Sequence, residues 1–214
     1  MTYQTQRQEL ILFGNRLLQE GFTKGTGGNL SIFDRQSRKM LITPSAIAYQ
    51  DITPEDIVVI DIDGRVVEGS RTPSSEWEMH LMIYRHREDI DALIHAHTTY
   101  CTAVACLRKE LPAVHYMIAV AGENVRCADY ATFGTRELAQ NALVAMDDRR
   151  AVLLANHGVL AGGVNLKDAF NVLEEVEYTA QLYYLTSSMG DPVILDHSEM
   201  EVMKEKFRTY GQQR

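Results

Sequence analysis

The sequence has no run of roughly 18 apolar residues, the length that a membrane-spanning helix requires. The segment from Met1 to Gln8 is polar and lacks the apolar stretch of a signal peptide. Cysteine is scarce: Cys101, Cys106 and Cys127 are odd in number and form neither a disulfide framework nor a C-x-x-C metal motif. We therefore expect reduced, mostly buried thiols in a cytoplasmic protein, with a nucleophilic cysteine as the less favoured alternative.

Positive charge is also in short supply, with 21 Lys and Arg against 29 Asp and Glu and a formal net charge of −8. This balance argues against a protein that binds nucleic acid or a membrane surface, because both partners require a basic face. An anionic small molecule stays possible, since a pocket that holds a metal can be locally positive. The 214 residues, 45% of them hydrophobic, predict a single domain over residues 1–214, with two small domains as the alternative.

The spacing of apolar residues predicts helices that alternate irregularly with short strands. Helices are expected over 9–18, 77–84, 98–107, 135–146 and 166–188, and from Ser198 to about Gly211. Strands are expected over 30–33, 40–43, 57–62, 65–68, 92–97 and 151–155, with a hairpin turn at Asp63-Gly64. Ser74 or Ser75, and Asn165, are expected to cap helices. The pattern predicts an α/β fold in which helices sandwich a mixed or antiparallel central sheet.

Three histidines follow apolar strands. His95 and His97 lie two residues apart, so on a strand they point to the same face. If the strands 92–97 and 151–155 lie side by side, His157 adds a third nitrogen, and three protein ligands with an open position are typical of catalytic zinc. Two surface or core histidines would show the same spacing, so this interpretation stays open. The other histidines have no partner at metal spacing and are expected to be surface or structural: His80, His86, His115 and His197.

Three polar turns are candidates for holding an anion. The glycine-rich loop 25–29 offers unhindered backbone N–H groups, although such a loop is often an ordinary turn. Ser74 and Ser75 stand where a helix begins, and Ser45 lies in a third hydroxyl-bearing turn; helix capping is the alternative for the serines. Glu76 in the first helical turn either complements the helix dipole or acts as a general base, and spacing does not decide between these roles.

Taken together, seven motifs resemble the class II aldolase/adducin family, nearest to its L-fuculose-1-phosphate aldolase branch. They are G-T-G-G-N (25–29), L-I-T-P-S (41–45), P-S-S-E-W (73–77), H-A-H (95–97), H-Y-M-I-A (115–119), Y-A-T-F-G-T-R-E (130–137) and N-H-G (156–158).

The resemblance implies a role for each matching residue. His95, His97 and His157 match zinc ligands, with one Zn²⁺ per subunit, and Glu76 matches an acid/base residue that also approaches the zinc when substrate is absent. The phosphate-binding positions are Gly28, Asn29, Ser45, Ser74 and Ser75, to which the amide of Ala46 is added. Tyr116 matches a catalytic tyrosine from a neighbouring subunit of a homotetramer, and Phe133 and Tyr210 match residues on the aldehyde side.

The implied enzyme is a zinc-dependent aldehyde-lyase of fucose metabolism. It would split a phosphorylated ketose, L-fuculose 1-phosphate, into dihydroxyacetone phosphate and L-lactaldehyde through a zinc-stabilised enediolate. Two residues depart from the family: Ala46, where many relatives have glycine, and Asp129, where proline is common. The alternatives are a sugar-phosphate 4-epimerase, a 3-oxo-tetronate-phosphate decarboxylase, a dehydratase and a non-catalytic adducin-like module. Glu76 favours carbon–carbon cleavage, because the epimerases usually carry Asp there.

Overall fold

The computed structural model describes residues 2–209, which are built around one sheet of eight strands in the order β4-β3-β2-β1-β5-β8-β7-β6. Neighbouring strands are antiparallel except β6 and β7, which are parallel, so the expected mixed sheet is confirmed. The strands are β1 (Asn29–Asp34), β2 (Lys39–Ile42), β3 (Val58–Asp61), β4 (Val66–Glu68), β5 (Ala92–Ala96), β6 (Cys127–Ala128), β7 (Ala151–Leu154) and β8 (Gly158–Gly163).

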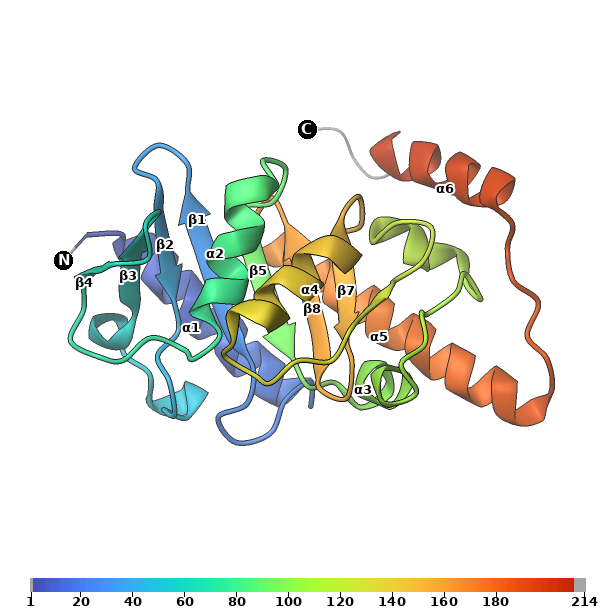
Figure 1. The fold of residues 1–214 in the computed structure, drawn as a ribbon, viewed down its shortest axis with the longest axis horizontal. Coiled ribbons are helices and arrows are strands. Elements are labelled where there is room, and N and C mark those ends of the chain that lie inside the picture. Colours follow the sequence, from blue (N-terminus) through green and yellow to red (C-terminus); the bar gives the residue numbers. More distant parts are fainter. Residues whose placement is uncertain (1, 210–214) are drawn as a thin grey trace.

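Helices cover both faces of the sheet (Figure 1). Helices α2 and α4 pack together on one face, and α1, α3 and α5 lie on the other, so a separate apolar core fills each side. The helices are α1 (Gln4–Gln19), α2 (Trp77–His86), α3 (Thr99–Cys106), α4 (Arg136–Met146), α5 (Leu166–Met189) and α6 (His197–Thr209), with short 3-10 helices η1 (Tyr49–Asp51), η2 (Pro54–Asp56) and η3 (Tyr116–Val120). Helix α6 packs on η3.

Strand β5 lies inside the sheet and is buried along its whole length. Leu93 faces the α2/α4 core and Ile94 the opposite core, as the alternation of a strand requires. Burying each such side chain stabilises the fold by about 1.5–3 kcal/mol. His95 stands opposite Asn29 of β1 on one side and Leu160 of β8 on the other. Its position is therefore fixed by two neighbouring strands.

Two strands were not expected from the sequence. Strand β8 contains three glycines, and β6 has only two residues, so neither shows a clear apolar alternation. The expectation that segments 92–97 and 151–155 lie side by side is wrong, because β8 lies between β5 and β7. His157 instead occupies the tight turn that joins β7 to β8.

The helix ends also differ in part from expectation. Helix α1 begins five residues earlier than predicted, because the polar first turn is anchored by the buried Arg7, which donates to the Ile57 carbonyl and pairs with Glu68, each at 2.7 Å. The capping position of α2 is Glu76 rather than a serine. The Asn165 cap is confirmed, since its side-chain oxygen accepts from the Asp168 N–H at 2.9 Å.

At the last helix, Asp196 rather than Ser198 accepts the free N–H of Glu199, at 2.9 Å, so α6 begins one residue before the predicted start. Gly211, its predicted end, lies outside the described residues. Of the three cysteines, only Cys101 is buried, while Cys127 is half-buried and Cys106 exposed, so the expectation of mostly buried thiols is wrong.

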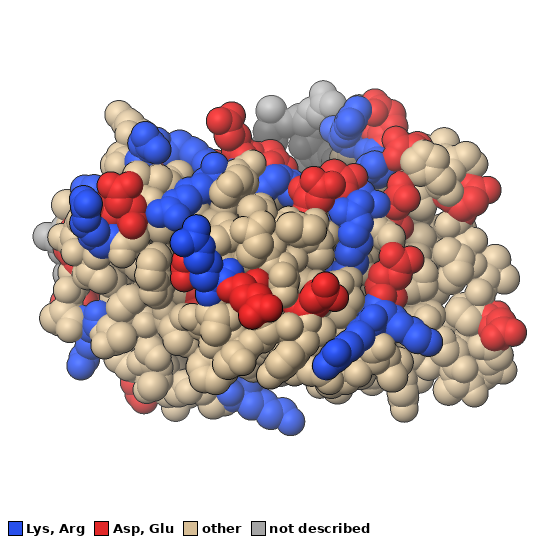
Figure 2. All heavy atoms as spheres, viewed as in Figure 1, with Lys and Arg blue, Asp and Glu red and all other residues tan. Residues whose placement is uncertain are grey.

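Positive and negative side chains are interspersed over the face shown in Figure 2 and do not gather into one basic patch there. Between residues 2 and 209, every helix is too short or too polar to cross a membrane.

Candidate metal centre and substrate pocket

The structure brings His95, His97 and His157 together. Their ligand nitrogens all lie within 4.8 Å of one another, and the two Nε2 atoms of His95 and His97 are 3.0 Å apart. His95 comes from β5, His97 follows its end, and the β7–β8 turn supplies His157. Pairing of β8 with β5 sets Val159 opposite Ala96, which carries His157 to the same end of the sheet.

The three imidazoles are prepared as neutral ligands. Burial lowers the pKa of His95 to about 3, with the neighbouring His97 adding to the effect. Burial, and then His95, lower the pKa of His157 to about 4, and burial lowers the pKa of His97. With the ring neutral, Nδ1–H of His95 donates to the Val159 carbonyl at 3.0 Å, which leaves the lone pair on Nε2.

The same lone pair faces a carboxylate oxygen. Oε2 of Glu76 lies 3.2 Å from Nε2 of His95, and Oε1 lies 3.5 Å from Nε2 of His157. Two electron-rich atoms at this distance repel each other unless a cation stands between them. Oε1 of Glu76 is also buried without a hydrogen-bond partner in residues 2–209. The donor set therefore fits a divalent metal ion.

Glu76 is aimed at this cluster and not at its own helix. Although it occupies the capping position of α2, its side chain makes no capping hydrogen bond in the described chain. Oε2 instead accepts from Nδ2 of Asn29, at 2.9 Å, and the residue is only 6% exposed. The geometry supports the general-base interpretation over simple complementation of the helix dipole.

Two glycines allow the neighbouring backbones to close on the histidine strand. Gly28 has a φ of 73°, and a Cβ there would lie 2.5 Å from the His95 carbonyl oxygen. A Cβ on Gly158 would lie 2.4 Å from the carbonyl oxygen of Ala96. Any side chain at either position forces β5 away from its neighbours.

A cavity of about 480 Å³ opens above the cluster. Ten of the predicted site residues line it: Gly28, Asn29, Ser45, Ala46, Ser74, Ser75, Glu76, His97, Phe133 and His157. His95 is fully buried. Tyr116, which is 45% exposed, borders a separate surface hollow with His115 and Tyr178. Tyr210 lies outside the described residues.

The two Thr-Pro-Ser turns, separate in sequence, form one wall of the cavity. The Ser45 N–H donates to the Thr72 carbonyl at 3.0 Å, and the Ser74 N–H donates to the Thr43 carbonyl at 3.1 Å. Of the described residues, those that line the cavity include no lysine or arginine. An anion at this wall would therefore be held by hydroxyl groups and by backbone N–H groups outside these two bonds.

Ala46 occupies a conformation that favours glycine. Its φ of 57° lies in the left-handed region, which costs an alanine about 1–2 kcal/mol. The departure from the family at this position therefore has a physical cost, while the residue still lines the cavity.

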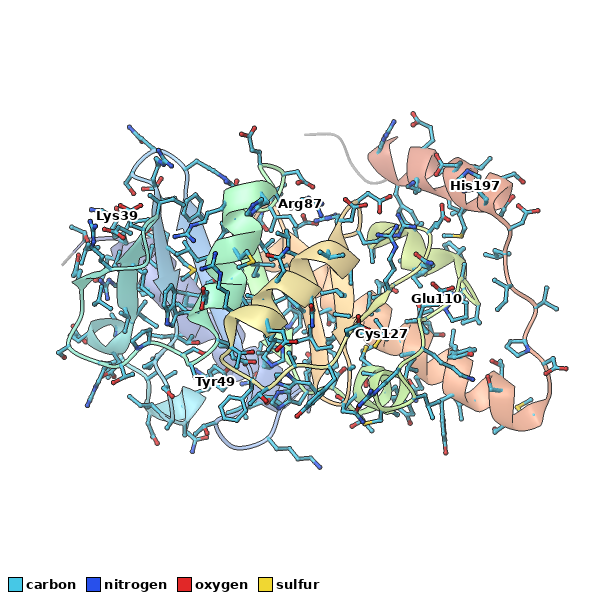
Figure 3. The ribbon with its side chains drawn as sticks, viewed as in Figure 1. Lys39, Tyr49, Arg87, Glu110, Cys127 and His197 are labelled. Carbon is cyan, nitrogen blue, oxygen red and sulfur yellow. The ribbon has the colours of Figure 1, made fainter. Side chains whose placement is uncertain are left out.

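Several residues of the site were missed from the sequence. Tyr49, labelled in Figure 3, is buried. Its hydroxyl donates to the Gly27 carbonyl at 3.3 Å, and this hydrogen bond helps to hold the glycine-rich loop 25–29 in place. Burial raises its pKa, with Glu76 adding to the effect. Its ring packs so closely on Gly14 of α1 that a Cβ there would lie 2.4 Å away. A single tyrosine in the short 3-10 helix η1, outside any motif, gives no sequence signal for such a role.

Arg108 contacts two residues that line the cavity. Nε of Arg108 donates to the side-chain oxygen of Asn156 at 2.9 Å, and its guanidinium lies 5.7 Å from the ring centroid of Tyr130. Asn156 and Tyr130 both line the cavity. Asn156 has a φ of 54°, a conformation that Asn tolerates better than most residues, and it turns the chain into His157.

A second group of possible ligands lies far from the cavity lining. His197 was expected to be a surface or structural residue, and it is exposed; Glu123 lies 2.8 Å from its Nδ1 and Glu201 completes the group. His197 and Glu201 are exposed, so this arrangement has the character of a surface ion pair.

Comparisons with known proteins agree with this geometry. Residues 8–184 match the family described as Class II Aldolase and Adducin N-terminal domain. The chain belongs to the class II aldolase/adducin family and is an aldehyde-lyase, so the predicted family and enzyme class are confirmed. A solved L-fuculose 1-phosphate aldolase superposes with a TM-score of 0.96 at 61% identity, covering 97% of this chain and 98% of that one.

Two curated relatives carry different substrate names. The 5-deoxy-D-ribulose 1-phosphate aldolase of Bacillus thuringiensis is 54% identical over 100% of both chains. The L-fuculose phosphate aldolase of Escherichia coli K12 is 48% identical over 89% of this chain and 88% of its own. The choice of sugar therefore does not follow from similarity alone.

Proposed function

We propose that this chain is a zinc-dependent aldolase that reversibly cleaves the C3–C4 bond of a deoxyketose 1-phosphate to dihydroxyacetone phosphate and a short aldehyde. The convergence of three neutral imidazoles and Glu76 beneath one cavity carries the proposal. Such a site suits cleavage next to a ketone, because this reaction leaves an electron pair on C3 that must be stabilised.

His95, His97 and His157 would hold the metal, with one coordination position left for substrate. Three imidazole nitrogens favour Zn²⁺ among the common divalent ions. When bound, the ion supplies Lewis-acid stabilisation of the negative charge that develops on the ketone half.

The phosphate group would be held away from the reacting bond. Gly28, Asn29, Ser45, Ser74 and Ser75 line one cavity and offer amides and hydroxyls, and the N–H of Ala46 can join them. Holding the phosphate there orients C3 toward Glu76 and supplies binding energy that does not depend on the bond being broken.

The proton balance requires two groups. Cleavage removes a proton from the C4 hydroxyl oxygen and adds one to C3. Glu76, oriented by Asn29, would in its protonated form deliver the proton to C3, and its carboxylate would take the proton back in the reverse direction. Tyr116 of a neighbouring subunit would accept the proton that the C4 hydroxyl loses and return it to the aldehyde oxygen in the reverse direction. This role is supported by the exposure of Tyr116 and by its place outside the residues that line the cavity in one chain.

That assignment predicts an oligomer with sites shared between subunits, and the family resemblance implies that this oligomer is a homotetramer. Glu76→Gln and Tyr116→Phe homo-oligomers should each be weak, whereas mixed oligomers should regain activity because some sites contain neither change. Mixing the two variants after reversible dissociation tests this directly. No gain over the sum of the parents contradicts a shared site.

Two substrates are the leading candidates, 5-deoxy-D-ribulose 1-phosphate and L-fuculose 1-phosphate, as the names of the relatives suggest. Both carry a terminal methyl group, which suits the apolar part of the wall at Ala131 and Phe133. The two substrates differ by one CHOH unit next to this methyl group. An apolar wall discriminates only weakly, by about 1–3 kcal/mol, against an added methylene or hydroxyl, so measurement must decide.

The test is product identification with both ketose phosphates. Dihydroxyacetone phosphate is followed by a coupled NADH-consuming reductase, and acetaldehyde or L-lactaldehyde is identified by chromatography. Release of dihydroxyacetone phosphate supports the aldolase. A phosphorylated sugar recovered only as its C4 epimer, or carbon dioxide released from a 3-oxo acid phosphate without ketose cleavage, assigns the chain to one of the related reactions instead.

A further inference from the structure

Behind the carboxylate of Glu76, a line of buried polar pairs joins helix α2 to strand β1. Glu76, His80 and Tyr84 are spaced four residues apart and share one stripe of α2, while Asn29 and Ser31 share one face of β1. The pairs meet in order: Asn29 with Glu76 at 2.9 Å, Ser31 with His80 at 2.6 Å, and Ser31 with Tyr84 at 2.7 Å. We call these five residues the polar seam.

The seam lies inside an apolar core. All five residues are at most 6% exposed, and His80 and Ser31 are fully buried. Burial lowers the pKa of His80 to about 3, so the ring is neutral. The Tyr84 hydroxyl also donates to the Ser31 carbonyl at 3.1 Å. Apolar side chains of similar volume would stabilise such a core as well or better. Stability therefore does not explain why polar groups occupy these positions.

The alignment of helix α2 on strand β1 explains these polar groups. A shift of one residue in the register of a helix against its neighbour rotates the contacting side chains by about 100° and moves them by about 1.5 Å along the axis. An apolar interface tolerates small displacements of this kind, whereas each polar pair of the seam is satisfied in one arrangement only. Because Glu76 is the seam's first residue, any such displacement takes its carboxylate away from Asn29 and from the histidine cluster.

We propose that His80 is a positioning residue for Glu76: through Ser31 and Tyr84 it holds α2 in a single alignment on β1 and so aims the carboxylate at the metal site. The kinetic part of this inference rests on the proposed aldolase reaction. The structural part, which is the placement of Glu76, does not depend on that reaction.

The variants His80→Leu and Ser31→Ala each break the central pair without touching a group that meets substrate. Met79→Leu is the matched control, since Met79 is 2% exposed on the same helix and lies outside the seam. Each variant is examined for metal content, kcat, KM and thermal unfolding. The metal-free protein is also crystallised, which gives the Asn29–Glu76 distance without any activity measurement.

We expect His80→Leu and Ser31→Ala to stay folded, bind one metal per chain and keep KM within about threefold, while kcat falls about 10- to 100-fold, the loss expected for a misplacement of about 1 Å. In the crystals, Glu76 should leave Asn29. His80→Asn, whose amide can still reach Ser31, should recover most of the lost kcat. Met79→Leu should keep the wild-type kcat and distance.

Wild-type kcat in a folded His80→Leu protein, with Glu76 still 2.9 Å from Asn29, overturns the proposal. So does a loss of kcat that merely follows the loss of folded protein and is shared by Met79→Leu. If His80→Leu does not fold, Ser31→Ala decides by the same criteria. If the wild-type protein cleaves no ketose 1-phosphate, the proposed function fails, while the crystallographic position of Glu76 still decides the positioning role.

Discussion

Replacing Glu76 by glutamine removes one charge and leaves almost the same shape. The glutamine oxygen can still accept from Nδ2 of Asn29, which lies 2.9 Å from the carboxylate in the wild-type chain. The imidazoles of His95 and His157, 3.2 and 3.5 Å away, keep their positions. We therefore expect Glu76→Gln to fold normally and to retain one metal per chain.

The loss should appear in the chemical step. General acid–base catalysis contributes about 10²- to 10⁴-fold, and an amide cannot carry the proton to C3. A decrease in kcat of about 10³-fold, or about 4 kcal/mol of transition-state stabilisation, is expected. KM should change little, because the glutamine keeps the shape of the site and its oxygen can still accept from Asn29, so the groups proposed to hold the phosphate stay in place.

The assay measures release of dihydroxyacetone phosphate from saturating ketose 1-phosphate, with metal content determined on the same sample. Glu78→Gln is the matched control, because Glu78 lies in the first turn of the same helix and outside the residues that line the cavity. It should keep kcat within about twofold, since a surface charge at a helix start is worth about 0.3–1 kcal/mol of stability and takes no part in proton transfer. Near-normal kcat in Glu76→Gln refutes the acid/base role.

Gly28→Ala should remove metal binding, because its Cβ would meet the His95 carbonyl oxygen and its φ is positive; retention of one metal per chain contradicts this. Without metal, the free energy of unfolding should fall as the pH drops from 6.5 toward 4, by about 1.4 kcal/mol per pH unit for each of His95 and His157. The reason is that both pKa values are lowered in the folded chain, so in this range the unfolded rings bind protons and the folded rings do not. Denaturant unfolding against pH measures this slope, and a flat profile excludes it. Tyr116→Phe should lower kcat about 10²-fold with unchanged binding of dihydroxyacetone phosphate, which equilibrium dialysis checks. Arg108→Ala should raise KM several-fold with normal metal content by loosening the cavity rim, and unchanged kinetics would remove that role.

The sequence predicted that the three histidines lie together, but it did not predict the strand order that brings them together. The two apolar runs, one before His95 and one before His157, correctly indicated buried strands beside these histidines. The intervening β8 could not be seen, since its glycines carry no side-chain pattern and serve a close approach to β5. A wrong pairing of strands thus led to a correct cluster, because a tight β7–β8 turn delivers His157 to the same end of the sheet.

Residues whose roles depend on tertiary contacts could not be predicted from the sequence. Tyr49, Arg108 and His80 belong to no local motif, and each matters through a partner far away in sequence. Arg7 explains the early start of α1 in the same way, because its partners Ile57 and Glu68 lie about fifty and sixty residues further on. Local patterns report a residue's periodicity, whereas buried polar pairs depend on the completed fold.

In the proposed reaction, one metal ion held by three imidazoles makes carbon–carbon cleavage possible. Titration of chelator-treated protein with Zn²⁺, following the release of dihydroxyacetone phosphate and the bound metal together, tests it most directly. Activity should be absent at first, rise in proportion to bound zinc and saturate at one ion per chain, and a His157→Ala variant should show neither tight binding nor activity. Full activity without metal, or an unchanged titration in His157→Ala, would contradict the account.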